Sequence, residues 1–226
     1  MQAIILCGGK GERLRPLTSK TPKPLIKIND KPILQYLLNN LKDHGINNVL
    51  LTAGYLSDEI RHFGREYSAN NDINLTVIDS GDVDIIDRLV SCRDKLDGDT
   101  IVLYGDTIAD VNITSLVDLK ASSPKSDIMS AIQLKSAFGL FKITDEGIAC
   151  NFAEKPSLNY WINIGFFVFS IETFHAMAKY RTFAEFLQDW TKKSKFKVNQ
   201  HSGVHITINT LDELESAKKH INTLGW

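Results

Sequence analysis

The stretch AIILCGGKGERLRPLTSKTPKPL, residues 3–25, carries most of the information about the fold and the binding site of this chain. Its first residues are apolar and indicate a buried strand, which runs directly into a glycine-rich, cationic loop. Gly8, Gly9 and Gly11 allow positive φ and let backbone amides approach a ligand, while Arg13 and Lys23 add positive charge. A strand followed by such a loop suits the binding of a polyphosphate.

Strand and helix patterns alternate through the first half of the chain. Short apolar, β-branched runs occur at 3–7, 48–53, 74–78 and 100–104. Helical patterns separate them, at 33–43, 56–67 and 85–96. The alternation predicts an α/β fold of the Rossmann-like, three-layer α/β/α type, in which helices cover both faces of a mixed, mainly parallel central sheet.

The pattern changes beyond about residue 125. Strand patterns separated by short turns follow one another at 127–134, 140–143, 148–153 and 161–169. We expect them to form a mixed extension of the sheet, with closing helices at 182–193 and 211–224. No linker rich in Pro, Gly or Ser marks a boundary, so one domain over 1–226 is expected.

Two segments should meet at one edge of the sheet. The glycine-rich loop follows the first strand, and Tyr104-Gly105-Asp106 ends the strand at 100–104. Ligands of open parallel sheets bind beyond the carboxyl ends of the strands. Asp106 would therefore offer a carboxylate beside the bound phosphates, where Mg²⁺ could be held.

The overall composition excludes several classes of protein. The 226 residues carry a formal net charge of −1, which gives no basic field for nucleic acid and no polybasic patch for a membrane. No apolar run approaches the roughly 20 residues of a membrane span. Cys7, Cys92 and Cys150 show no paired spacing, which argues against a disulfide framework and against a zinc site. We expect a cytoplasmic protein without nucleic-acid or membrane partners.

The loop does not fit the two common phosphate-binding motifs. It lacks the Gly-Lys-Ser/Thr ending of a Walker loop, and Leu14 stands where the dinucleotide fingerprint needs its third glycine. The longer pattern L-x-G-G-x-G-x-R-L-x-P-L-T-x-x-x-P-K-P-L resembles the signature loop of the sugar-1-phosphate nucleotidyltransferases. The resemblance implies the nucleotide-diphospho-sugar transferase fold and an enzyme that joins a nucleoside triphosphate to a sugar 1-phosphate, using Mg²⁺ and releasing pyrophosphate.

The same resemblance assigns roles to individual residues. Arg13, Lys23 and Asp106 would be catalytic, and Asp106 would share a metal with Asn209, which stands where the family has a second aspartate. A nucleotide-binding half at about 1–113 would precede an acceptor-binding half at about 114–226. The nucleotide would contact Leu6, Gly8, Gly9, Gly11, Asp79, Ser80, Gly81 and Gly105.

Two further landmarks of the family lie in the second half. Glu154-Lys155-Pro156 is similar to the family's E-K-P turn, and Asn163 and Gly165 occupy an I-N-x-G strand. On that likeness Lys155 would hold the acceptor phosphate, Glu154 and Asn163 would bond acceptor hydroxyls, and Gly165 would leave room for the sugar ring. Homo-oligomers are usual in the family, although the sequence itself gives no oligomeric state.

Several segments look closest to the glucose-1-phosphate cytidylyltransferases, which favours CTP as donor and a role in surface polysaccharide or glycoconjugate synthesis. Two departures limit this likeness. The T-G-G-R-L of those enzymes becomes Ile86-Asp87-Arg88-Leu89, which keeps the Arg-Leu pair but loses the glycines, so nucleotide contact there is in doubt. Asn209 brings an amide where a carboxylate is usual, which should weaken metal binding.

Three alternatives therefore stay open. The first uses GTP or dTTP with a heptose or hexose 1-phosphate. The second uses CTP with phosphocholine, which Tyr160 and Trp161 could box, although Trp161 is more simply interpreted as strand core. The third is a catalytically weak regulatory subunit that binds a nucleotide sugar.

Overall fold

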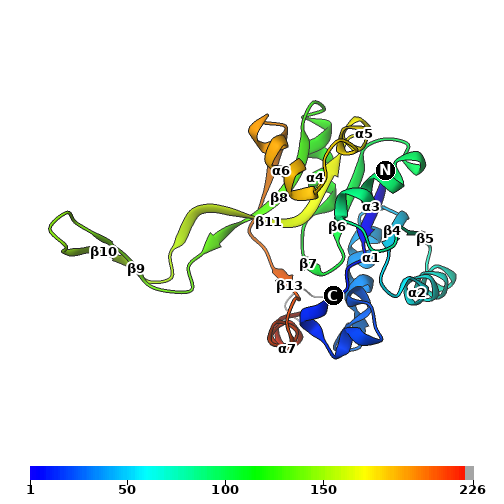
Figure 1. The fold of residues 1–226 in the computed structure, drawn as a ribbon, viewed down its shortest axis with the longest axis horizontal. Coiled ribbons are helices and arrows are strands. Elements are labelled where there is room, and N and C mark those ends of the chain that lie inside the picture. Colours follow the sequence, from blue (N-terminus) through cyan, green and yellow to red (C-terminus); the bar gives the residue numbers. More distant parts are fainter. Residues whose placement is uncertain (222–226) are drawn as a thin grey trace.

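A seven-stranded sheet forms the centre of the molecule (Figure 1). The structure is a computed structural model and describes residues 1–221. The strand order is β12-β8-β11-β6-β1-β4-β5, and only β11 runs antiparallel to its neighbours. These strands are β1 (Gln2–Leu6), β4 (Asn48–Ala53), β5 (Asn74–Asp79), β6 (Thr100–Tyr104), β8 (Asp127–Lys135), β11 (Ser157–Phe169) and β12 (Phe196–His201). The predicted mixed, mainly parallel sheet is confirmed.

The first strand lies inside this sheet because it is apolar on both faces. β1 pairs in parallel with β4 and β6, so that Ala3 lies beside both Val49 and Ile101. Ala3, Ile4 and Ile5 are fully buried. A continuous apolar run of this kind is typical of a parallel strand covered by helices on both sides.

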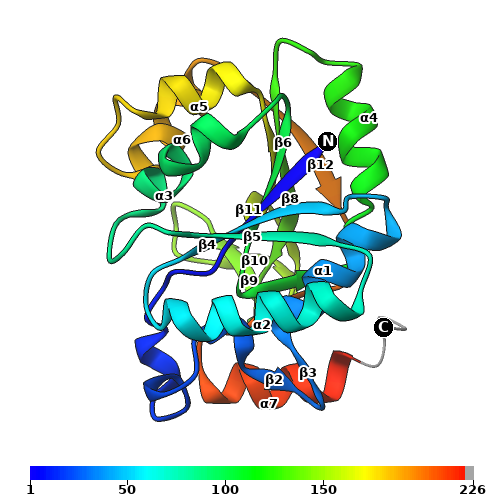
Figure 2. The same ribbon diagram turned by 90° about the vertical axis from the view of Figure 1, so that its right-hand side faces the viewer.

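Helices cover both faces and complete the predicted three layers. Ile5 and neighbouring residues pack against α1, α2 and α4, whereas Ile4 packs with α3, α5 and α6 on the opposite face. Figure 2 shows α3, α5 and α6 grouped together, away from α1 and α2. Their bounds are α1 (Ile33–Asp43), α2 (Ser57–Asn70), α3 (Ile85–Cys92), α4 (Ile113–Ala121), α5 (Ile171–Met177) and α6 (Phe183–Lys192).

A smaller layer brings the end of the described chain next to the carboxyl end of β6. The short strands β7 (Thr107–Ala109) and β13 (His205–Thr207) pair antiparallel, and the Ile208 amide donates to the Asp106 carbonyl oxygen at 3.1 Å. Helix α7 (Leu211–His220) follows and packs near the two-residue strands β2 (Lys27–Ile28) and β3 (Lys31–Pro32). The helix predicted at 211–224 is therefore present to His220, and its last three positions lie outside the described residues.

A long projection leaves the body beyond the ends of β8 and β11 (Figure 1). Its two strands, β9 (Leu140–Ile143) and β10 (Ala149–Ala153), pair only with each other within the described residues. We call residues 136–156 the arm. The predicted extension of the sheet is correct for β8 and β11 and wrong for β9 and β10, because their apolar side chains point into solvent instead of a core. Trp161, interpreted as strand core, is likewise 43% exposed.

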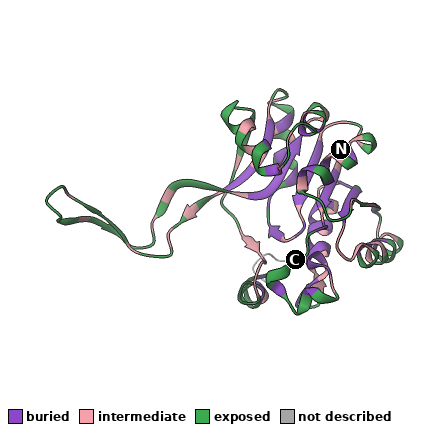
Figure 3. Cartoon of the chain, viewed as in Figure 1, coloured by how far each residue is buried: buried purple, intermediate pink, exposed green. Residues whose placement is uncertain are grey.

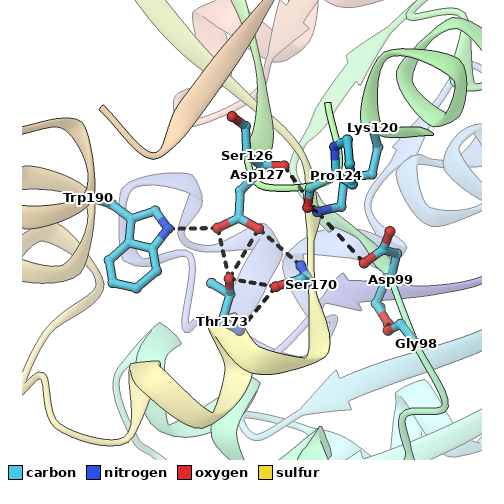
Figure 4. A network of polar contacts seen from close by, with 10 residues as sticks. Gly98, Asp99, Lys120, Pro124, Ser126, Asp127, Ser170, Thr173 and Trp190 are labelled. Carbon is cyan, nitrogen blue, oxygen red and sulfur yellow. Dashed lines mark hydrogen bonds and ion pairs between the residues drawn. The ribbon is translucent and has the colours of Figure 1, made fainter. Parts of the chain in front are cut away.

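One buried polar network fixes the helices of the second half to the sheet (Figure 4). Asp127, at the start of β8, accepts hydrogen bonds from the Ser170 amide at 3.0 Å, the Thr173 hydroxyl at 2.9 Å and the Trp190 indole at 2.6 Å. Burial raises the pKa of this carboxyl group. Nearby Lys120 donates to the carbonyl oxygens of Pro124 and Ser126 and pairs with Asp99, just before β6, at 3.8 Å, so the network also ties α4 to the first half of the chain.

No helix within residues 1–221 combines the length and the apolar character that crossing a membrane requires.

Candidate active site

A cavity of about 450 Å³ opens at the carboxyl ends of β1 and β6, where the sequence predicts the ligand. It is lined by Leu6, Cys7, Gly8, Gly9, Lys10, Lys23, Pro24, Asp82, Val83, Asp84, Ile85, Arg88, Tyr104, Gly105 and Asp106. The glycine-rich loop and the segment after β6 therefore meet, although about 95 residues separate them in the chain. Parallel pairing of β1 with β6 causes this convergence.

The glycine-rich loop folds back on itself before the chain reaches Lys23. Gly11 has φ +60°, and its carbonyl oxygen accepts hydrogen bonds from the Leu14 amide and the Thr18 hydroxyl, both at 2.9 Å. A Cβ at this position would lie 3.0 Å from the Thr18 methyl carbon and 3.2 Å from the Lys23 Cβ. Glycine is required here because of both the backbone angle and the close packing.

Lys23 connects the three segments that the sequence analysis assigned to catalysis and metal binding. Its Nζ donates to Asp106 Oδ2 at 2.6 Å and to Asn209 Oδ1 at 2.9 Å. The Lys23 side chain is 11% exposed and that of Asp106 is 30% exposed. The ion pair is thus shielded on the lysine side and open to a ligand on the aspartate side.

Local structure holds both oxygen ligands of Lys23 in place. Asp106 follows β6, and the Gly105 amide just before it donates to the Leu6 carbonyl oxygen at 3.1 Å. Asn209 precedes α7, whose capping box uses Thr210 and Glu213. The Glu213 carboxylate also accepts from the Asn209 amide at 2.5 Å, so the start of this helix positions the asparagine side chain.

These two oxygens form a donor set that fits Mg²⁺. Asp106 and Asn209 each direct a side-chain oxygen at the same cation, the Lys23 ammonium. Mg²⁺ in nucleotide enzymes is usually held by one or two protein oxygens together with substrate phosphates. Within residues 1–221 no cluster of three or more His, Cys, Asp or Glu side chains is suited to a metal, so the phosphates would have to complete the coordination.

Arg88 is a site residue that the sequence analysis did not include. Its guanidinium donates to the carbonyl oxygens of Gly8 at 3.1 Å and Ala53 at 3.0 Å, and to the Ser80 hydroxyl at 3.1 Å. The residue is only 4% exposed, and burial lowers its pKa. Arg88 thus fixes the glycine loop to the ends of β4 and β5, and the Arg-Leu pair at 88–89 was the one available signal.

The predicted nucleotide residues after β5 lie at the edge of the site. Asp79 accepts from the Gly81 amide at 3.0 Å and pairs with Arg61 at 3.3 Å. A hydrogen bond with Ser57 is the main cause of its lowered pKa. Asp79, Ser80 and Gly81 are not among the described residues that line the cavity, which the next segment, Asp82 to Ile85, lines instead.

The four predicted acceptor residues divide into two pairs. Asn163 and Gly165 lie beside Tyr104: the Asn163 amide nitrogen is 3.4 Å from the Tyr104 hydroxyl, and a Cβ on Gly165 would lie 2.4 Å from its ring. Burial raises the pKa of Tyr104 to about 12, so its hydroxyl remains protonated at neutral pH. Glu154 and Lys155 lie in the arm and are exposed.

Arg13, the remaining predicted catalytic residue, is exposed on the 3₁₀ turn Glu12–Leu14. Like Gly11, it is not among the described residues that line the cavity. The geometry therefore brings Lys23, Asp106 and Asn209 together and leaves Arg13 at the outer side of the loop.

Comparison with known proteins identifies the scaffold. Residues 2–208 match the nucleotidyl transferase family. The chain belongs to this family. It is a nucleotidyltransferase of the sugar-1-phosphate type, and the fold implied by the glycine-rich signature is confirmed.

Relatives differ in the nucleotide that they use. The chain is 29% identical to a Bacillus subtilis protein named "Probable glucose-1-phosphate cytidylyltransferase", over 98% of this chain and 96% of the relative. It is 30% identical to the D-glycero-alpha-D-manno-heptose 1-phosphate guanylyltransferase of Campylobacter jejuni, over 86% of this chain and 88% of the relative. A UDP-glucose pyrophosphorylase solved with UDP-glucose has the same fold, with a TM-score of 0.77, 14% identity and 98% coverage of both chains.

Proposed function

We propose that this nucleotidyltransferase joins CTP to a sugar 1-phosphate and releases pyrophosphate. The product would be a nucleotide sugar for surface polysaccharide or glycoconjugate synthesis. The observation that carries the proposal is the Lys23 ammonium, which contacts both Asp106 and Asn209 next to a glycine-rich loop and a cavity of about 450 Å³.

The reaction needs little covalent chemistry from the protein. A phosphate oxygen of the acceptor attacks the α-phosphorus of the triphosphate and forms a new P–O bond. The bond between the α-phosphorus and its bridging oxygen to the β-phosphate breaks, and pyrophosphate leaves with the electron pair. Positioning and charge stabilisation therefore determine the rate.

Lys23 and Arg13 would stabilise the negative charge of the triphosphate and of the transferring phosphoryl group. Amides of the loop at Gly8, Gly9 and Gly11 would bind phosphate oxygens, with Leu6 and Gly105 nearby. Asp106 and Asn209 would hold Mg²⁺, whose charge, when bound, helps to neutralise the phosphates. Arg88 would keep the loop in place through the Gly8 carbonyl.

The acceptor would bind in the second half of the chain, with Asn163 bonding a hydroxyl and Gly165 leaving room for the ring. Glu154 would bond a second hydroxyl and Lys155 would hold the acceptor phosphate. This division repeats the two predicted halves, with the nucleotide at about 1–113 and the acceptor at about 114–226.

CTP is favoured as donor because the relative that matches over nearly the full length of both chains carries a cytidylyltransferase name. A second candidate, GTP with a heptose 1-phosphate, is supported by the guanylyltransferase relative, which has a similar identity over most of its length.

A screen of pyrophosphate release tests both candidates. CTP, GTP, UTP and dTTP are each combined with glucose 1-phosphate, a heptose 1-phosphate and phosphocholine, with and without Mg²⁺. We expect release with CTP and a sugar 1-phosphate, dependent on Mg²⁺. Release with GTP and heptose 1-phosphate alone would select the second candidate. Tight binding of a nucleotide sugar with no release in any combination would contradict an active enzyme.

A further inference from the structure

A chain of hydrogen bonds leads from the side chain of His205 to the carboxylate of Asp106. The Thr107 hydroxyl lies 3.1 Å from Asp106 Oδ1 and 3.4 Å from the Thr207 hydroxyl. The Thr207 hydroxyl in turn lies 3.0 Å from His205 Nε2. We call these four side chains the relay. The reaction described above gives no role to the histidine or to either threonine.

Antiparallel pairing of β7 with β13 builds the relay. Thr207 lies directly opposite Thr107, a position from which threonine hydroxyls bond across strands. His205 is two residues earlier on β13, so its side chain leaves the strand on the same face as that of Thr207. Figure 3 shows β7 as buried and β13 as partly buried. Thr107 is only 2% exposed, so solvent has little access to the middle of the relay.

The carboxylate of Asp106 sets the direction of every hydrogen bond in the relay. As the partner of the Lys23 ammonium it is ionised, and an ionised carboxylate only accepts. Thr107 gives its single hydroxyl hydrogen to Asp106 and therefore accepts from Thr207. Thr207 gives its hydrogen to Thr107 and therefore accepts from His205. The His205 ring must then carry its hydrogen on Nε2.

The other tautomer of His205 does not fit this arrangement. With its hydrogen on Nδ1, the ring would accept from Thr207 at Nε2. The two threonine oxygens would then face each other at 3.4 Å with no hydrogen between them. Burial, and to a smaller degree His201, lowers the pKa of His205 below its ordinary value, so the ring is neutral at neutral pH and holds one hydrogen only.

The relay and Lys23 together hold both oxygens of the Asp106 carboxylate. Lys23 donates to Oδ2 at 2.6 Å, and the relay donates to Oδ1 at 3.1 Å. The terminal torsion of an aspartate side chain has broad minima, so a single contact would leave the plane of the carboxylate poorly defined. Contacts on both oxygens fix that plane, and with it the direction in which the remaining lone pairs meet the cavity.

We propose that His205 is a positioning residue of this enzyme, which acts through Thr207 and Thr107 to orient the Asp106 carboxylate toward Mg²⁺ and the triphosphate. The proposal rests on the metal-binding role given to Asp106 under Proposed function. It adds that this role depends on the strand pair β7–β13, which touches the carboxylate from the side away from Lys23. Loss of a hydrogen-bond partner of a metal ligand typically costs about 10- to 100-fold in metal affinity or activity.

The tautomer of His205 tests the relay without substrate or metal. Long-range proton–nitrogen correlation spectra of the labelled protein distinguish the two tautomers of each histidine. The spectrum of His205→Gln assigns the signals of this residue by their absence. At about pH 8, where the ring is neutral, we expect the hydrogen on Nε2. A hydrogen on Nδ1, or an even mixture of the two tautomers, would overturn the proposal.

Two pairs of matched variants test the effect on Asp106. Thr207→Val removes the hydroxyl and keeps the branched shape, whereas Thr207→Ser keeps the hydroxyl. His205→Gln places an amide N–H as many bonds from Cα as Nε2 is, whereas His205→Asn places it closer to the backbone. We expect Thr207→Val and His205→Asn to raise the Mg²⁺ concentration for half-maximal pyrophosphate release by about 10-fold. Thr207→Ser and His205→Gln should stay within about twofold of the wild type.

Calorimetric titration with Mg²⁺ repeats the comparison without turnover, and circular dichroism verifies the fold of each variant. An unchanged Mg²⁺ requirement in Thr207→Val would show that the relay does not act on Asp106. An equal loss in His205→Gln and His205→Asn would show that packing, not the Nε2 donor, is what matters. Either result would contradict the proposal.

Failure of the relay and failure of the proposed function give different results. If no substrate pair released pyrophosphate, the proposed function would fail, and the tautomer of His205 would still decide whether the relay exists. If the wild type were active and His205 carried its hydrogen on Nδ1, the relay would fail and the proposed function would stand.

Discussion

Two lysine–aspartate groups lie at opposite ends of this fold, and their surroundings differ. In the catalytic group Lys23 contacts Asp106 at 2.6 Å, and the aspartate side chain is 30% exposed next to the cavity. In the buried network of Figure 4, Lys120 and Asp127 are almost fully enclosed, and backbone and side-chain partners occupy their polar atoms.

The difference separates a group built for a ligand from a group built for packing. Asp127 takes three kinds of donor from α5, α6 and the residue before α5, so both of its carboxylate oxygens already have partners from its own chain. Asp106 has an internal bond from Thr107 and its contact with Lys23, and its remaining surface faces the cavity. Catalytic loss without unfolding should therefore mark the first group, and unfolding without catalytic loss the second.

Removal of Lys23 should have the largest effect. Lys23→Ala is expected to lower turnover by at least about 100-fold, because a cation aimed at the developing phosphate charge is lost. Pyrophosphate release measures the change, and circular dichroism verifies the fold. Lys120→Ala is the matched control, and its folded fraction should keep wild-type turnover. A fully active Lys23→Ala protein would remove Lys23 from the mechanism.

Removal of Asp127 should instead lower the stability of the fold, because Asp127 is the central acceptor of the buried network in Figure 4. Asp127→Ala leaves the Ser170 amide, the Thr173 hydroxyl and the Trp190 indole without their acceptor, and we expect a loss of about 3 kcal/mol in the free energy of unfolding. Urea titration measures it, with Asp106→Ala as the comparison, which should change stability far less. Equal losses in the two variants would contradict the distinction.

A change at Asn209 tests whether this residue helps to hold Mg²⁺ in the catalytic group. Asn209→Asp adds a second carboxylate opposite Lys23, which should lower the Mg²⁺ concentration for half-maximal activity by about 10-fold. Activity is measured across a Mg²⁺ series, and direct Mg²⁺ titration by calorimetry gives an independent reading. An unchanged Mg²⁺ requirement would argue that Asn209 does not contact the metal.

The smallest expected effect concerns pH. Burial raises the pKa of Asp127 in the folded state above its ordinary value, so the folded protein binds this proton more tightly than the unfolded chain does. The stability contributed by the protonated group is then lost as pH rises from about 4 through the folded-state pKa. Unfolding of the wild type and of Asp127→Asn at several pH values should show the advantage of the wild type shrinking with rising pH. A growing advantage would reverse the assigned sign.

Local sequence patterns were sufficient to predict most of the sheet. The strands at 48–53 and 100–104 and the helix at 33–43 have the predicted bounds, because continuous apolar runs and helical periodicity reflect burial within one chain. The same reasoning could not predict that β9 and β10 leave the central sheet and form the arm. Apolar residues at 140–143 and 148–153 indicate that a surface is covered but not which chain covers it.

The sequence predicted the position of site residues that directly follow a strand. It did not predict contacts between side chains that lie far apart in the chain. Asp106 could be placed beside the glycine loop because parallel strands end at one edge. The contact of Lys23 with Asn209 spans 186 positions, and it depends on β13 pairing with β7, directly after β6. Arg88 carries no local sign that its charge is buried.

Arg88 also limits which side chains position 8 can accept. A Cβ at Gly8 would lie 1.9 Å from its Nη1 atom, and the guanidinium supplies the three nearest atoms. Alanine at position 8 would therefore force the Arg88 guanidinium to move, away from its hydrogen bonds to Gly8, Ala53 and Ser80. The two positions are sterically coupled: the side chain that holds the glycine loop in place also fills the space that a side chain at position 8 would need.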